Sequence, residues 1–429
     1  MKKHILFLAL FGFSSALWAQ TPAQEQEKRV ILYGGIAHLG NGTLLDHSVI
    51  IFEEGKITAV ADARTVRLDT NGAEYHDITG KHVYPGFILP NTSLGLAEID
   101  AVRATRDYNE VGSYTPNVRG IIAYNTESKI TATVRTNGIL MAQICPRGGV
   151  LPGRSSLVDL DGWNWEDAAY LMDEGQQLYW PSMVTWQWGE GWVTNEDYQT
   201  DIEELKAFFK KAKAYTQMKN PKQKDLRYEA LRGIFSGKEA LYIHANFASD
   251  IEQSVLFAKD LGVKRIVVVG GKEAHRVTDF LVKHEIPLIL SRLHSLPYHE
   301  DDPVDLPYKL PKILYDAGVL FCLDYQGDME RMGSRNLPFL AGTARAYGIP
   351  EEEAVKLITS NPAKIFGISD LVGTLEPGKD ASIVVSEGDA LDMASNRIVL
   401  AFIRGKKLEL TNHQMELYEK YKGKIEEGK

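Results

Sequence analysis

The sequence predicts an α/β protein in which a β/α barrel interrupts a small composite β-sandwich built from both ends of the chain. Residues 29–84 show short β-rich runs separated by Gly-Asn-Gly and Glu-Glu-Gly turns, which are typical of antiparallel strands. Residues 85–366 alternate continuous apolar runs with amphipathic helices, the pattern of a parallel sheet. Residues 367–412 return to short strands and turns, and residues 413–429 form a charged helix or tail.

The alternation of strands and helices is clearest in the second half of the predicted barrel. RIVVVGG at 265–271 is a buried strand, the segment 273–287 places its apolar residues on one helical face, and IPLIL at 286–290 is the next strand. A later segment, 350–367, begins with proline and three glutamates, the residues that favour a helix N-terminus. We therefore expect strand and helix to follow one another through this part of the chain.

Residues 1–19 have the features of a secretory signal peptide. Positive charge at Met1–Lys3 precedes the apolar run Ile5–Phe13, and small residues lead to a cleavage site after Ala19. The apolar run is too short to span a bilayer. The sequence thus predicts a protein that is exported, to a bacterial periplasm or elsewhere, and that is soluble after cleavage.

The net charge indicates which class of partner is not expected, and the cysteine positions limit the possible disulfides. Removal of residues 1–19 takes away two lysines and moves the formal net charge from −9 to −11. No basic cluster stands out, so nucleic acid is not expected as a partner. The only cysteines, Cys145 and Cys322, each lie in an apolar, strand-like run. They are read either as buried free thiols or, since export permits it, as a disulfide.

Four segments together resemble the amidohydrolase superfamily, and the resemblance is closest to its imidazolonepropionase-like branch, which includes Xaa-Pro dipeptidases. YPGFILPNTSLGL resembles the first barrel strand, and ALYIHANFASDIEQSV a mid-barrel strand that carries a metal ligand. GVLFCLDYQGD resembles the eighth strand with its aspartate. TSNPAKIFGISDLVGTLEPGKDASIVV resembles the closing segment that leads back into the sandwich. The resemblance implies a (β/α)8 TIM barrel plus the composite sandwich.

The resemblance also implies a reaction, the hydrolysis of C–N bonds by a water that one or two divalent ions, usually zinc, activate. In the family the first strand ends in His-x-His, with an acidic residue two places earlier. Here the acidic position is Leu89, and the histidine positions are Asn91 and Ser93. Neutral amide and hydroxyl oxygens are weak zinc ligands.

Two of the implied ligand positions keep their residue types. His244 matches the first mid-barrel histidine, and Asp324 matches the aspartate that serves the family as ligand and base. Gly270 and Gly271 stand where the second histidine is expected. Zinc requires three or four protein ligands. The resemblance therefore leaves two alternatives, a single weakly bound zinc at His244 and Asp324, or no metal.

Six of the seven tryptophans fall within residues 163–192, and the seventh lies in the signal segment. This tryptophan-rich segment has three alternative interpretations: a lid over the barrel mouth, an interface with another subunit, or a segment that folds a small core of its own. We expect Trp163 and Trp165, with Asn91 and Ser93, to contact substrate.

Two functions follow from these observations. The first is an exported amidohydrolase that acts on a small amide, cyclic amide or peptide-like substrate, with Asp324 as base and His244 as ligand or orienting group. The second is a non-catalytic protein that binds a ligand or pairs with a catalytically complete paralogue. The replaced residues at positions 89, 91, 93 and 270 favour the second function. Either a homo-oligomer or a hetero-oligomer is compatible with the sequence.

Overall fold

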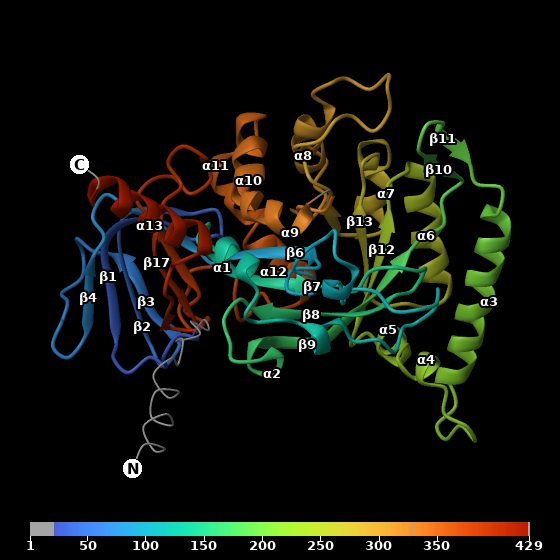
Figure 1. Ribbon diagram of the computed structural model, residues 1–429, viewed down its shortest axis with the longest axis horizontal. Coiled ribbons are helices and arrows are strands. Elements are labelled where there is room, and N and C mark those ends of the chain that lie inside the picture. The colour runs from blue at the N-terminus through green and yellow to red at the C-terminus, as the bar shows by residue number, and fades with distance from the viewer. Residues whose placement is uncertain (1–20, 328, 428–429) are drawn as a thin grey trace, which may run out of the picture.

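The computed structural model describes residues 21–327 and 329–427, so the predicted signal peptide lies outside the described residues. Figure 1 shows two parts, a mixed sheet at the left and a larger barrel in the centre, from which a hairpin extends at the upper right. Within the described residues, none of the helices combines the length and the apolar composition that a bilayer span requires.

The mixed sheet is composite, because strands from both ends of the chain pair within it. Its order is β18-β17-β16-β5-β1-β2-β3, and β4 pairs with β1. β16 pairs antiparallel with both β5 and β17, which joins the two ends of the chain. The expected sandwich is thus one continuous sheet. Its strands are β1 (Val30–His38), β2 (Leu44–Glu53), β3 (Lys56–Asp62), β4 (Glu74–Asp77), β5 (His82–Pro85), β16 (Ile383–Ser386), β17 (Ile398–Ile403) and β18 (Lys406–Lys407).

The second sheet forms a near-closed barrel of eight strands, which confirms the predicted α/β architecture. Its order is β15-β14-β13-β12-β9-β8-β7-β6. Backbone oxygens of Leu357 and Ile358 accept hydrogen bonds from Leu323 in β15 and Ile88 in β6, and this segment fills the gap between the first and last strands. The strands are β6 (Phe87–Thr92), β7 (Ile139–Ile144), β8 (Gly153–Asp159), β9 (Ala169–Tyr179), β12 (Ala240–Ala245), β13 (Ile266–Gly270), β14 (Leu288–Leu290) and β15 (Phe321–Leu323).

One barrel strand runs against the others. β8 pairs antiparallel with β7 and with β9, whereas the remaining neighbours in the barrel pair in parallel. β8 therefore starts at the mouth, where the parallel strands end, and finishes at the opposite end of the barrel. The chain turns there through α2 (Trp165–Ala168) and returns to the mouth along β9.

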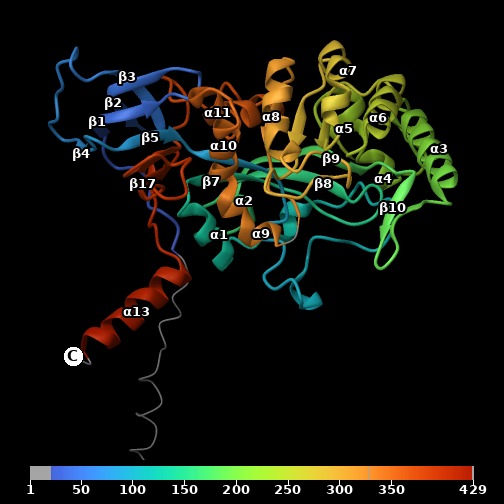
Figure 2. The ribbon, with the colours of Figure 1, turned by 90° about the horizontal axis from the view of Figure 1, so that it is seen from above.

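Helices cover the barrel and carry its apolar faces inward. They are α1 (Lys129–Arg135), α3 (Tyr198–Thr216), α4 (Leu226–Glu229), α5 (Arg232–Ser236), α6 (Ala248–Asp260), α7 (Thr278–Lys283), α8 (Leu306–Asp316), α9 (Glu330–Gly333), α10 (Leu337–Ala346), α11 (Glu351–Lys356) and α12 (Ser360–Phe366). The last helix, α13 (His413–Glu427), extends away from the rest of the molecule in Figure 2. Cys145 and Cys322 are buried and unpaired, which confirms the reading as free thiols.

Candidate functional site

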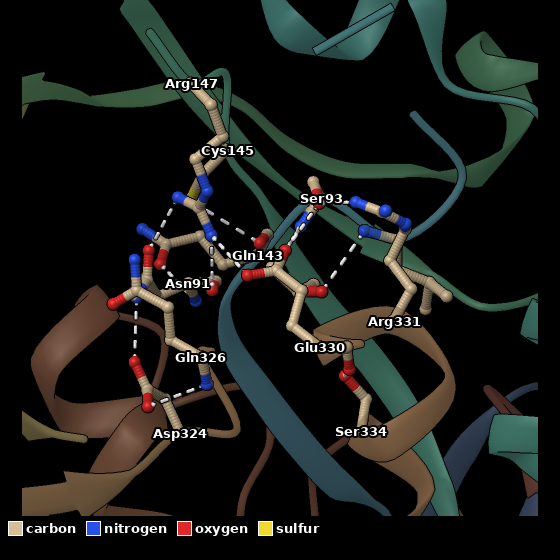
Figure 3. Close-up of polar contacts among 12 residues, drawn as sticks. Asn91, Ser93, Gln143, Cys145, Arg147, Asp324, Gln326, Glu330, Arg331 and Ser334 are labelled. Atoms are coloured by element: carbon tan, nitrogen blue, oxygen red, sulfur yellow. Dashed lines mark hydrogen bonds and ion pairs between the residues drawn. The ribbon is translucent and has the colours of Figure 1, made fainter. Parts of the chain in front are cut away.

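Polar side chains meet at the mouth of the barrel because the parallel strands end there. TIM-barrel sites are built at this end of the strands. Figure 3 shows the part of this cluster that surrounds Asn91. The residues at or just beyond the strand ends are Asn91 in β6, Ser93 after β6, Arg147 after β7, Tyr179 in β9, His244 in β12, Gly270 in β13 and Asp324 after β15.

Asn91 connects the first and last strands of the barrel. Its Nδ2 donates to Oδ2 of Asp324 at 2.7 Å, and its backbone N–H donates to Oε1 of Gln143 at 3.0 Å. The backbone of Asn91 has φ +49°, in the left-handed region that asparagine tolerates better than most residues. The side chain is buried, so these contacts with other protein groups determine its orientation.

Arg147 is the cation that contacts Asn91, and nothing in the sequence pattern singled it out. Its Nη1 donates to Oδ1 of Asn91 at 2.8 Å, and its Nη2 donates to the backbone oxygen of Asn91 at 2.8 Å. Tyr179 accepts a further hydrogen bond at 3.4 Å, and Oε2 of Glu330 lies 3.5 Å from Nη2. The guanidinium therefore lies against one of the positions where the family has a histidine ligand (Figure 3).

Ser93, like Asn91, forms hydrogen bonds with other protein groups. Its backbone N–H donates to Oε1 of Glu330 at 2.9 Å, and its hydroxyl donates to the same oxygen at 2.5 Å. Arg331 donates from Nη1 to the Ser93 hydroxyl at 2.7 Å. The hydroxyl has thus used its one proton and accepts from an arginine, so it is a poor ligand for a second cation.

Asp324 lies fully buried beside Asn91. Its Oδ1 accepts from the backbone N–H of Gln326 at 3.1 Å, and its Oδ2 accepts from Asn91. Burial raises the pKa of Asp324 to about 7, and the hydrogen bond from Asn91 only partly opposes this. Each oxygen accepts one hydrogen bond from a protein donor, so the carboxyl group connects the end of β15 to Asn91 in β6, and its role as general base stays a prediction.

His244 is neutral and stacked. Its ring lies 4.0 Å from the ring of Tyr179, measured between centroids, with 11° between the planes. Burial lowers the pKa of His244 well below its ordinary value, and the charge of Arg147 acts in the same direction. Its Nε2 lies 2.8 Å from Oε1 of Gln177.

A chain of hydrogen bonds assigns the tautomer of His244. Glu174 accepts the Ser155 hydroxyl proton at 2.5 Å, so Ser155 must accept from Nε2 of Gln177 at 2.9 Å. The oxygen of Gln177 then faces His244, which makes Nε2 of His244 the protonated nitrogen. Nδ1 is left as a hydrogen-bond acceptor.

Gly270 cannot be replaced by a larger residue without rearrangement. Its φ is +106°, and a Cβ at this position would lie 2.6 Å from Oδ1 of Asn246 and 3.0 Å from the backbone oxygen of Ala245. Both facts exclude a side chain here in the present backbone. The absence of a histidine ligand at this strand end is therefore built into the local geometry.

A cavity of about 220 Å³ opens beside His244 at the barrel mouth. Gln326 and Asn246 contribute polar groups to its wall, whereas Asn91, Ser93 and Asp324 are not among the described residues that line it. A hairpin of β10 (Val184–Gln187) and β11 (Gly191–Thr194) forms one side of it. Its aromatic walls are Tyr179, Trp180, Trp192, Phe247 and Tyr298.

The tryptophan-rich segment does not form one unit. Trp163 and Trp165 lie where β8 turns into β9, at the end of the barrel opposite the mouth, so the prediction that they contact substrate at the mouth needs correction. Only the later tryptophans reach the mouth, and Trp192 contacts Phe247 and Tyr298 edge-on at 5.8 and 5.2 Å. The reversal of β8, which the sequence pattern did not indicate, separates the two groups.

The residues present do not fit a divalent metal at the family's position. Among residues 21–327 and 329–427, no three His, Cys, Asp or Glu side chains converge so that they could hold an ion. Asn91 and Ser93 each accept a hydrogen bond from an arginine, and Arg147 already provides a positive charge in contact with Asn91. A divalent ion beside this guanidinium would be repelled, most strongly where water is excluded.

Comparisons with known proteins agree with the fold. Residues 309–408 match the amidohydrolase family. The amidohydrolase tasK of Hapsidospora irregularis is 20% identical over 384 residues, which are 81% of this chain and 38% of that protein. The chain thus spans less than half the length of this curated relative.

Two solved structures share the architecture along nearly their whole length. An amidohydrolase from Thermotoga maritima MSB8 has a TM-score of 0.77 and 23% identity, over 89% of this chain and 99% of that one. A Xaa-Pro dipeptidase with methionine bound in its active site has a TM-score of 0.53 and 12% identity, over 89% and 100%. The chain thus shares the fold of these two proteins, and residues 309–408 match the amidohydrolase family.

Proposed function

We propose that this chain is an exported amidohydrolase-superfamily protein whose barrel mouth binds a small amide or peptide-like ligand without a catalytic metal. The observation that carries the proposal is the contact of the Arg147 guanidinium with both oxygens of Asn91. A protein cation thus contacts Asn91, one of the positions at which the resemblance implies a metal ligand. Export rests on the predicted signal peptide, and the imidazolonepropionase-like branch stays a prediction.

The cavity suits such a ligand. Its aromatic walls would cover an apolar side chain, and aromatic rings provide large contact areas. Nδ1 of His244 can accept a hydrogen bond from an amide N–H, whereas Gln326 and Asn246 can both donate and accept. These groups bind and orient an amide, but none of them is activated as a nucleophile.

Metal content and turnover test the proposal together. The mature protein would be purified without chelator or histidine tag, its metals measured by mass spectrometry, and dipeptides and N-acyl amino acids assayed for amine release. We expect well below one metal ion per chain and no hydrolysis, with the same result for His244→Ala. About one ion per chain that disappears in His244→Ala but persists in the exposed control His413→Ala, together with hydrolysis, would refute the proposal.

Pairing with a complete paralogue is a second candidate. Trp186 and Trp188 are 59% and 97% exposed at the end of the β10–β11 hairpin, an unusual position for such large apolar side chains. The chain also matches only 38% of the length of the tasK relative, so that protein has room for a further domain of similar size. Under this candidate the exposed tryptophans contact the partner while Trp192 serves the cavity.

A further inference from the structure

The hydrogen bonds that lead through the barrel interior to His244 begin at a backbone group, which fixes their direction. The N–H of Asn91 donates to Oε1 of Gln143 at 3.0 Å. Because a backbone N–H can only donate, the amide of Gln143 turns its oxygen to Asn91 and its nitrogen to Glu174. Nε2 of Gln143 accordingly donates to Oε1 of Glu174 at 2.7 Å. The side-chain amide of Gln143 therefore has a single orientation.

The carboxylate of Glu174 is the acceptor on which these hydrogen bonds converge. Its Oε1 also accepts from the Ser155 hydroxyl at 2.5 Å, and its Oε2 accepts from the Tyr242 hydroxyl at 2.6 Å. Glu174, Ser155 and Tyr242 are all buried. Burial raises the pKa of Glu174, whereas the hydrogen bonds from Gln143, Ser155 and Tyr242 oppose that rise because they stabilise the charged form.

The hydroxyl of Ser155 transmits this direction to His244. Its proton points to Glu174 at 2.5 Å, since the backbone oxygen of Gly175 is farther away, at 3.2 Å. Ser155 must then accept from Nε2 of Gln177 at 2.9 Å, which turns Oε1 of Gln177 toward the ring of His244. His244 thus donates from Nε2, and its Nδ1 carries no proton.

Two features hold the ring of His244 in this state. The ring stacks on Tyr179, with 4.0 Å between the centroids and 11° between the planes. Burial lowers the pKa of His244, and the charge of Arg147 lowers it further, so the ring stays neutral. Among the residues that the structure describes, Gln177 is the one hydrogen-bond partner of this ring, and His244 lines the aromatic cavity. Nδ1 can therefore only accept a hydrogen bond, and it is left for a ligand.

We infer that this chain of hydrogen bonds makes the barrel mouth selective for amides that carry an N–H, with Ser155 and Gln177 as the positioning residues. The inference rests on the proposed function, since it states which amides the mouth binds. Nδ1 of His244 accepts from the N–H of a primary or secondary amide. A tertiary amide, such as one whose nitrogen belongs to a proline ring, has no such proton and leaves Nδ1 unpaired. An unpaired acceptor in a buried site lowers the affinity.

Two isomeric probes isolate the N–H. N-benzylpropanamide and N-benzyl-N-methylacetamide have the same atoms, and each has a benzyl group and a carbonyl on its amide nitrogen. Only the first has a proton on that nitrogen. Binding of each isomer to the intact protein would be measured by calorimetry. We expect the secondary amide to bind about tenfold more tightly than the tertiary one.

Ser155→Ala tests the origin of this preference. Without the hydroxyl, the amide of Gln177 can turn over and donate to His244, so both tautomers become populated and the preference should fall to about twofold or less. Ser156→Ala is the matched control, because Ser156 is the next residue of β8, is equally buried and accepts from the backbone N–H of Asp173 instead. It should keep the parent preference. If circular dichroism shows that Ser155→Ala does not fold, Gln177→Leu replaces it, since leucine removes the acceptor of the Nε2 proton.

The tautomer of His244 is a second readout, which a general loss of stability would not change. Nitrogen-15 NMR of histidine-labelled protein distinguishes a protonated ring nitrogen from an unprotonated one, and His244→Gln identifies the signals of His244 by their absence. We expect the proton on Nε2 in the parent protein and in Ser156→Ala, and on either nitrogen in Ser155→Ala. A proton on Nδ1 in the parent protein, or an unchanged preference in the folded Ser155→Ala or Gln177→Leu variant, would overturn the inference.

The binding results separate this inference from the proposed function. Equal binding of the two isomers, or tighter binding of the tertiary amide, would refute the selectivity but not the metal-free mouth. Metal-dependent hydrolysis together with an intact preference for the secondary amide would refute the proposed function alone. If neither isomer binds, both proposals fail.

Discussion

At the scale of single residues, the surroundings of Asp324 determine the pKa and the hydrogen bonds of its carboxyl group. The family motif implies a base, but here the carboxyl group is buried and occupied by Asn91 and Gln326. It connects the ends of β6 and β15 through its hydrogen bond with Asn91. The sequence pattern places Asp324 at a strand end, whereas the partner that contacts it there comes from a distant segment of the chain.

The raised pKa of Asp324 makes a prediction about stability. With a pKa of about 7 in the folded state and 3.8 for the ordinary side chain, the folded protein keeps this proton where the unfolded chain releases it. The stability that the proton contributes is complete below about pH 4 and is lost as the pH rises through 7. The side chain at position 324 cannot ionise in Asp324→Asn. When the pH rises from 5 to 8, the unfolding free energy of the parent protein should therefore fall by about 3 kcal/mol more than that of Asp324→Asn.

Urea unfolding at the two pH values measures this difference. Other buried acids, such as Asp159 and Glu239, titrate in both proteins and cancel in the comparison. Asp316→Asn, at a 57% exposed position paired with Lys312, should behave as the parent protein does. A stability difference between Asp324→Asn and the parent that is the same at pH 5 and pH 8 would contradict the prediction.

At the scale of elements, the β10–β11 hairpin determines the shape of the cavity. Trp192 connects the hairpin to the start of α6 and to the loop after β14, through edge-on contacts with Phe247 and Tyr298. An aromatic pair of this kind contributes about 0.5–1.5 kcal/mol. The hairpin is otherwise a two-stranded sheet, which is marginally stable by itself.

Trp192→Ala should therefore loosen the hairpin without unfolding the barrel. We expect the amides of residues 184–194 to exchange hydrogen roughly tenfold faster, since two aromatic contacts are lost. Trp188→Ala, at a side chain that is 97% exposed, should leave exchange unchanged. Hydrogen exchange followed by mass spectrometry compares the two variants. Equal exchange would show that other contacts hold the hairpin, and release of a bound partner by Trp188→Ala would favour the second candidate function.

At the scale of the whole molecule, the two ends of the chain depend on each other. β16 lies between β5 and β17, and apolar residues from both ends share one core, among them Val83, Ile383 and Phe402. Burial of such side chains contributes about 1.5–3 kcal/mol each. The N-terminal strands therefore cannot be stable without the C-terminal ones.

A truncated chain of residues 1–380 should fail to fold, because it leaves β5 unpaired along one edge and exposes this core. A chain that ends at residue 412 lacks only α13, whose described residues are almost entirely exposed. It should melt within a few degrees of the full-length protein. Circular dichroism and gel filtration distinguish these outcomes, and a cooperative, native-like melt of 1–380 would contradict the composite sheet.

The sequence by itself determined the order of strands and helices, the composite small sheet and the strand ends that hold Asn91, His244, Gly270 and Asp324. These features follow from local periodicity and from motifs within one strand, which neighbouring residues decide. Only the tertiary structure decided that β8 runs backward, that the tryptophans divide between the two ends of the barrel, and that Arg147 contacts Asn91. Each of these depends on residues far apart in the chain, and the arginine is 56 positions from its partner. The chemistry of the mouth is therefore set by long-range contacts that no local pattern encodes.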